Sequence, residues 1–322
     1  MPKGQIEVGP STPAGEAAGR IIQVKAQPLF DAAGKTVGGD DIEVIHDMRV
    51  ASRRVRAALG LFAPLYRRRV VREWDAAFGE LTSVLGRVRD ADVMIATMRQ
   101  MFGRAKDPDE RATLAYIIGY RQGVRVGELR RLRKRLRAME LGKMRPRLAK
   151  AMESLRDVPE VGLPLSELAG QAIEPRVASM FGYVPAVLSP ESAEAQHAMR
   201  IACKELRYAV ETLRPAFDDR YEELHALLTR FQDELGALHD LDVFIDYVRG
   251  LRRDADAKAA GVRPQGLAAV AADLSARRRR RFVRVRRLVN ANPESKVRAA
   301  LMDAIVAPAV PQGAPESVSE SG

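Results

Sequence analysis

Four basic side chains recur in one segment at spacings that would place them on one side of a helix. His46, Arg49, Arg53 and Arg56 stand at relative positions 0, 3, 7 and 10. At about 100° per residue these positions fall within an arc of about 80°, and ten residues rise about 15 Å. Arginine presents paired donors to phosphate oxygens, and lysine or protonated histidine adds a point charge. This first stripe could therefore contact successive groups of an extended phosphate polyanion.

A second stripe with the same spacing lies 151 residues later and consists of His197, Arg200, Lys204 and Arg207. Residues 22–66 align with residues 173–217 without a gap, and seven of the twenty-one pairs from residue 46 to residue 66 are identical. After one residue is deleted from the second copy, residues 85–93 align with residues 235–243. Such a repeat predicts that the order of helices is duplicated.

The opposite side of each segment is apolar, so each predicted helix has a core face and a cationic face. A solvated basic face would normally carry acidic partners one turn away, but no carboxylate stands within either stripe. We therefore favour ligand binding. Arginine-rich segments at 108–139 and roughly 264–290 close the two halves, and four of their residues join the predicted phosphate-binding set: Arg133, Arg137, Arg280 and Arg284.

Two pairs of aspartates follow the stripes, Asp90 with Asp92 and Asp240 with Asp242. Each pair is expected to begin a helix, where one carboxylate would cap the free amides. The other carboxylate would instead brace an arginine or histidine of the stripe. These two interpretations stay open, and both rank above catalysis.

The histidines favour anion binding over metal binding. His46 and His197 are interpreted as phosphate donors in their protonated forms. His225 is expected at the surface, and His239 aligns with Arg89, which suits anion contact. We expect no metal, no cofactor and no catalytic residue.

Composition limits the remaining possibilities. The 322 residues are 46% hydrophobic and carry a formal charge of +11, which favours a folded protein with an anionic partner. One cysteine, Cys203, excludes an intramolecular disulfide. The absence of an apolar leader or membrane-spanning run predicts a cytoplasmic protein without a membrane span. Residues 1–18 and 307–322, rich in small and turn-forming residues, are expected to be disordered tails.

Helix punctuation predicts an all-α body. Asp107 and Ser189, each followed by proline, are expected to cap helices. Gly119, Gly123 and Gly127 fall four residues apart, which would let a neighbouring helix approach closely.

The two stripe segments, residues 44–56 and 196–208, each followed by Gly-x-x-x-Asp-x-Asp at Gly86 or Gly236, resemble the CHAD family, the conserved histidine α-helical domain. The resemblance implies two pseudo-symmetric four-helix-bundle repeats, here residues 19–160 and 161–306, around a central basic cavity. It also implies binding of inorganic polyphosphate, association with polyphosphate granules, and no demonstrated catalysis.

Two other functions fit parts of the sequence. Nonspecific nucleic acid is an alternative ligand because Arg277–Arg281 form a run, but aromatic residues total only 5% and neither stripe carries a stacking platform. A metal-dependent phosphohydrolase is suggested by His197 and by His239 with Asp240, whereas Arg89 in the other half argues against it. The oligomeric state is left open.

Overall fold

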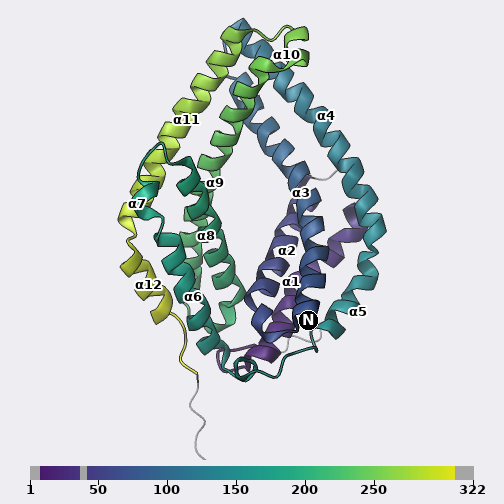
Figure 1. The fold of residues 1–322 in the computed structure, drawn as a ribbon, viewed down its shortest axis with the longest axis vertical. Helices are drawn as coiled ribbons and strands as arrows, with labels where there is room; N and C mark the ends of the chain where they lie inside the picture. Colours follow the sequence, from purple (N-terminus) through teal and green to yellow (C-terminus); the bar gives the residue numbers. More distant parts are fainter. Residues whose placement is uncertain (1–7, 37–41, 309–322) are drawn as a thin grey trace, which may run out of the picture.

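The all-α fold predicted from the sequence is confirmed by a computed structural model, which describes residues 8–36 and 42–308. Within these residues the regular elements are helices, and extended contacts are limited to isolated bridges. None of the helices in these two ranges is long and apolar enough to cross a membrane. Figure 1 shows two groups of long helices that lean together at both ends of the molecule.

The first group contains five α-helices: α1 (Ala14–Thr36), α2 (Ile42–Leu61), α3 (Arg68–Phe102), α4 (Pro108–Met139) and α5 (Leu141–Ala151). The second contains α6 (Leu165–Phe181), α7 (Val184–Val187), α8 (Ala193–Thr212), α9 (Tyr221–Gly250), α10 (Ala255–Ala259), α11 (Pro264–Ala291) and α12 (Glu294–Asp303). Short 3-10 turns join some of them at Ala63–Leu65, Pro159–Val161, Arg214–Ala216 and Leu251–Arg253. The helices α2 and α8 are equally long and begin 151 residues apart, which matches the sequence alignment.

Each group of helices is closed by the same kind of backbone tie. An isolated bridge joins Tyr66 to Leu155 in the first group, and the corresponding bridge joins Phe217 to Ile305 in the second. These ties bring the residues that follow α5 and α12 back to the turn after α2 or α8. The groups contact each other where α2 packs against α8 and where α4 packs against α11 (Figure 1).

The predicted helix starts are partly confirmed. Asp107 caps α4, and its side chain accepts a hydrogen bond of 2.8 Å from the amide of Glu110. The predicted start at Ser189 is wrong, because the hydroxyl of Ser189 donates to Glu191 at 2.8 Å and α8 begins only at Ala193. The hydroxyl is thus bonded within a turn.

The predicted helix starts at the aspartate pairs are also wrong. Asp90 and Asp92 lie inside α3, and Asp240 and Asp242 lie inside α9. The buried apolar positions continue through both segments, from Leu85 and Val88 onward in α3 for example. A helix that continues through the pair has no free amides there, so helix capping is excluded as the role of these carboxylates.

Two hydrophobic clusters form the core. The larger one joins α1, α2, α3, α5, α6, α8 and α9 with the C-terminal parts of α4 and α11, and the smaller one lies where α3, α4, α9 and α11 meet near α10. The predicted close approach at Gly119, Gly123 and Gly127 is wrong, since a Cβ added at any of them would meet no atom within 4 Å. The close approach occurs at Gly266, whose added Cβ would collide with the backbone of Asp109 and the side chain of Thr113.

The expected N-terminal tail is too long. Residues 8–18 are described, α1 begins at Ala14, and Ala14, Ala17 and Ala18 are fully buried. These small side chains allow α1 to pack closely against its neighbours, although their composition resembled that of a tail. Residues 1–7 and 309–322 of the expected tails lie outside the described residues. The division into repeats at residues 160 and 161 stays a prediction.

Candidate functional site

The two stripes lie on helices that pack against each other, so cations of one stripe act on cations of the other. Burial lowers the pKa of Lys204, and the charge of Arg53 on α2 lowers it further. Burial also lowers the pKa of Arg200, where Asp240 opposes the shift and Arg53 adds to it. The structure therefore brings Arg53, Arg200 and Lys204 into one cationic zone between the halves.

Arg49 and Arg200 occupy corresponding positions in the two stripes and share one feature of their guanidinium groups. The Nε atom of each is buried and has no hydrogen-bond partner among the described residues. Burial, reinforced by the charge of Arg53, lowers the pKa of Arg49 to about 10 although Asp90 favours its charged form. Unsatisfied donors of this kind cost about 1–3 kcal/mol each, and an anion would supply the missing acceptors.

The two aspartates of each pair have different neighbours. The first acts on stripe arginines, and the second contacts α4 or α11, the helices that close the two halves. Asp90 favours the charged forms of both Arg49 and Arg200, and Asp240 favours that of Arg200. Burial raises the pKa of Asp240, while Arg200 opposes that rise. The first carboxylate of each pair is therefore an electrostatic neighbour of the stripe arginines.

The second carboxylate of each pair contacts a closing helix. Asp92 accepts from Nε of Arg125 on α4 at 2.5 Å. Asp242 accepts from Arg278 on α11, which also donates to Gln196 at 2.8 Å and to the carbonyl of Pro190 at 2.9 Å. These ion pairs hold α4 against α3 and α11 against α9. Local spacing could not predict the two arginine partners, because they lie 33 and 36 residues from their aspartates.

The last arginine of each stripe already has a carboxylate partner. Arg56 forms two hydrogen bonds to Asp75, of 2.9 and 3.3 Å. Arg207, with only 8% of its surface exposed, donates to Gln232 at 2.8 Å and to Glu211 at 3.0 Å. These partners lie outside the four-residue stripes, so inspection of the stripes alone missed them. In this structure Arg56 and Arg207 help hold helices together.

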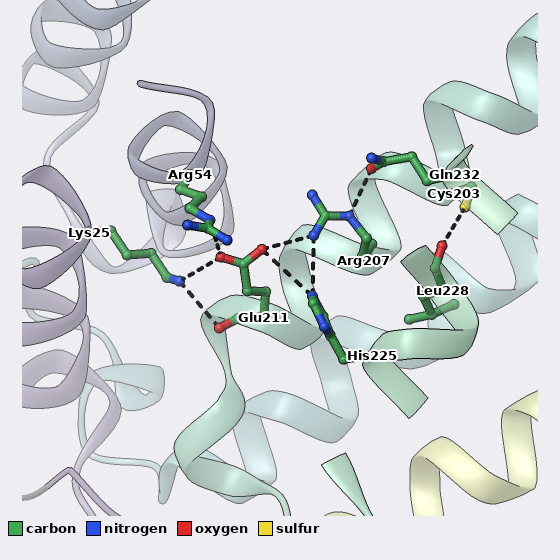
Figure 2. Close-up of polar contacts among 8 residues, drawn as sticks. All are labelled: Lys25, Arg54, Cys203, Arg207, Glu211, His225, Leu228 and Gln232. Atoms are coloured by element: carbon green, nitrogen blue, oxygen red, sulfur yellow. Dashed lines mark hydrogen bonds and ion pairs between the residues drawn. The ribbon is translucent and has the colours of Figure 1, made fainter. Parts of the chain in front are cut away.

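Figure 2 shows that Glu211 is the centre of a cluster joining the two halves. Its carboxylate forms ion pairs with Nζ of Lys25 on α1 at 3.4 Å and with Nε of Arg54 on α2 at 2.5 Å. Burial raises the pKa of Glu211, but His225 and the three cations around it outweigh burial and bring the pKa to about 2. We name this set, with Arg207 and Gln232, the Glu211 cluster.

His225 belongs to the Glu211 cluster, which corrects its expected surface position. Its Nε2 lies 3.2 Å from Nη1 of Arg207 and 3.9 Å from the carboxylate of Glu211. The sequence offered one signal for the cluster, since Glu211 follows Arg207 by four residues and such pairs meet on a helix. The partners on α1 and α2 gave no such signal.

The histidines of the two halves have different surroundings. His197 and His239 are in direct contact, with their Nδ1 atoms 3.1 Å apart and their ring centroids 4.2 Å apart. Burial lowers the pKa of both, to about 4 for His239, and the charge of Arg200 adds to each shift. His46 is half-buried on α2. In the first half the position of His239 is taken by Arg89.

Two pockets of about 590 Å³ flank this zone. One, the stripe pocket, lies between α2, α3, α6 and α8 and is lined by Arg53, Arg56, Arg176 and Lys204 among others. The other, the α11 pocket, lies between α3, α9 and α11 and is lined by Asp240, Arg104 and four arginines of α11, including the predicted Arg280 and Arg284.

The structure separates two predicted residues from this arrangement. Arg133 and Arg137 line an open pocket of about 560 Å³ whose described lining residues all belong to α4. They are not brought together with Arg280 and Arg284. For metals, the described ranges contain no group of three or more His, Cys, Asp or Glu side chains that could hold an ion.

The sequence profile of the CHAD domain matches residues 26–249, and the chain belongs to this family. Two solved structures share the fold. The CHAD domain from the plant Ricinus communis is 21% identical, with a TM-score of 0.68 over 90% of this chain and 96% of that chain. PptA from Streptomyces chartreusis is 14% identical, with a TM-score of 0.69 over 87% of this chain and all of that chain (100%). No curated protein matches the sequence.

Proposed function

We propose that the protein binds inorganic polyphosphate between its two halves, through the basic faces of α2 and α8. The polymer would take its main contacts from Arg49, Arg53, Arg200 and Lys204, with His46 and His197 as further donors. We propose a binding role without catalysis. Membership of the CHAD family supports this proposal through the polyphosphate binding that the resemblance implies.

The observation that carries the proposal is the pair of unsatisfied arginines. Arg49 and Arg200 come from different halves, are partly buried, and keep Nε donors without acceptors among the described residues. Asp90 and Asp240, which favour the charged forms of these arginines, do not hydrogen-bond to the two Nε atoms. A polyanion lying between α2 and α8 would supply acceptors to both arginines at once.

The helix α3 supports a long ligand over a single phosphate. Thr82 lines the stripe pocket, and Val93 lines the α11 pocket. Eleven helical residues separate them, a rise of about 16 Å. One extended chain could follow this face of α3 through both pockets, whereas a small anion could occupy only one. By this account the protein would be targeted to, or would organise, polyphosphate granules in the cytoplasm.

Nucleic acid is the alternative ligand, and the ion pairs of α11 argue against it. Within the arginine run, Arg277 pairs with Asp273 at 3.0 Å and Arg281 pairs with Glu234 at 2.8 Å. Arg278 is held by Asp242. The run is therefore largely neutralised by internal partners, which leaves less charge for a duplex than the sequence suggests.

Competition tests the choice of ligand directly. A labelled long-chain polyphosphate bound to the protein would be challenged with unlabelled polyphosphate, heparin or DNA at equal phosphate or sulfate concentration. We expect polyphosphate to displace the label at far lower concentration than either rival. Equal displacement by DNA would favour a general polyanion binder. A phosphate-release measurement on the same samples is expected to show no turnover, and sustained release would contradict the binding-only role.

A further inference from the structure

The stripe pocket has an excess of cations. Its charged lining residues are Arg53, Arg56, Arg176, Lys204, Asp75 and Glu205. Arg56 and Asp75 neutralise each other through their two hydrogen bonds. Three cations and one carboxylate remain around about 590 Å³ of space. A bound anion would balance this excess of positive charge.

The Glu211 cluster occupies the corresponding place in the other half of the molecule. The alignment of the two halves, with the register of residues 85–93 and 235–243 carried back along α3 and α9, relates five residues of the cluster to lining residues of the stripe pocket. The pairs are Lys25 and Arg176, Arg54 and Glu205, Arg207 and Arg56, His225 and Asp75, and Gln232 and Thr82. The contacts correspond as well, because Arg207 bonds to His225 where Arg56 bonds to Asp75. The two places are therefore pseudo-equivalent sites.

The central residue distinguishes the two sites. Glu211 in the cluster corresponds to Gly60 in the stripe pocket, and Gly60 lines that pocket. The Glu211 carboxylate bonds to Lys25, Arg54 and Arg207 (Figure 2). At Gly60 an added Cβ would meet no atom within 4 Å. One site thus carries its own anion. The other has Arg176 and Arg56 in the places of Lys25 and Arg207, and Glu205 in the place of Arg54, around an open space.

We propose that the stripe pocket binds a phosphate group whose oxygens take the place that the Glu211 carboxylate holds in the pseudo-equivalent site. Arg176, Arg53 and Lys204 would supply the donors. Arginine suits phosphate because its planar group donates two parallel hydrogen bonds. The phosphate could be free orthophosphate or the end of a polyphosphate chain, and only the second source rests on the proposed function.

A glutamate placed at position 60 tests the proposal, because it would give the stripe pocket its own carboxylate. Wild type, Gly60→Glu and the control Gly60→Ala would be melted with inorganic phosphate and with chloride at equal ionic strength. We expect phosphate to raise the Tm of wild type and of Gly60→Ala, and to leave that of Gly60→Glu unchanged. Equal phosphate responses of the two variants, or no response in wild type, would overturn the proposal.

The reciprocal variant Glu211→Gly would open the other site. We expect a lower Tm than in wild type, and a larger rise in Tm on addition of inorganic phosphate, because phosphate can then fill both sites. A phosphate response no larger than that of wild type would contradict the equivalence of the two sites.

Long-chain polyphosphate distinguishes the two sources of the phosphate group. If chain ends bind here, Gly60→Glu should bind the polymer several-fold more weakly than Gly60→Ala. If only free orthophosphate binds here, the polymer lies outside the stripe pocket and the two variants should bind the polymer equally. That result would also contradict the proposed path of the polymer through both pockets. The variant Arg49→Glu with Arg200→Glu should lose the polymer but keep the orthophosphate response, so failure of the proposed function can be told from failure of this pocket.

Discussion

At the scale of single residues, the stripes contain two kinds of arginine. Arg56 and Arg207 have carboxylate partners and hold helices together. Arg49 and Arg200 have buried Nε donors without acceptors in the described structure. Because an unpaired donor gains most from a ligand, substitutions of the two kinds should separate stability from binding.

Removal of the Glu211 charge should mainly affect stability. We expect Glu211→Gln to lower the free energy of unfolding by about 3 kcal/mol, because Lys25, Arg54 and Arg207 would lose a shared carboxylate that is only 10% exposed. Urea unfolding measures this change. The control Glu222→Gln breaks an exposed pair with Arg214 and should cost less than about 1 kcal/mol. Equal costs would show that the cluster does not join the halves.

His197 should make polyphosphate binding depend on pH. Burial and the charges of Arg200 and Lys204 lower its pKa in the free protein, and a bound phosphate would raise the pKa by favouring the protonated ring. Affinity should therefore be greatest below the free-state pKa and fall as pH rises through the bound-state pKa.

Dissociation constants measured from about pH 5.5 to about pH 8.5 would test this. His197→Gln should flatten the fall, whereas the control Arg49→Gln should weaken binding and keep the fall. Identical pH profiles of wild type and His197→Gln would show that this histidine is structural.

At the scale of elements, sequence patterns predicted what depends on near neighbours. Apolar periodicity predicted the core faces of α2 and α8, and Met48, Val55, Met199 and Leu206 are buried. The cap at Asp107 could be predicted because its partner, the amide of Glu110, is only three residues away. The helix starts predicted at the aspartate pairs were wrong, because α3 and α9 continue through them. The carboxylates of Asp92 and Asp242 pair instead with Arg125 and Arg278, which come from distant helices.

The same limit applies to the site. The stripes were visible in the sequence, but the cluster at Glu211 required Lys25, 186 residues away, to be placed beside it. The contact of His197 with His239 likewise spans 42 residues. Pairing across helices depends on how the helices pack, and local spacing carries no information about that packing.

Asp242 braces α11 through its ion pair with Arg278. We expect Asp242→Asn to lower the free energy of unfolding by about 2 kcal/mol, because Arg278 is 15% exposed and would lose its charged partner. Polyphosphate affinity should also fall, since Arg278 contacts Gln196 beside His197. The control Asp246→Asn, in an exposed pair with Arg249, should change neither quantity measurably. A loss of stability as large in the control would contradict the bracing role.

At the scale of the whole molecule, two halves of similar helix order place one stripe each at their contact. A polymer that touches both stripes meets the second at high effective concentration once the first is engaged. The paired sites at Glu211 and at the stripe pocket show that the halves have diverged within this common arrangement. The carboxylate of Glu211 fills one site, and the stripe pocket is open.

Calorimetric titration of long-chain polyphosphate tests whether Arg49 and Arg200 together hold the polymer. Wild type should bind one polymer segment per molecule, with an affinity that falls steeply as salt rises, as in other phosphate polyanion complexes. The variant Arg49→Glu with Arg200→Glu should lose binding while circular dichroism shows unchanged helicity, because both side chains face away from the apolar core. Unchanged affinity in the folded variant would contradict the account.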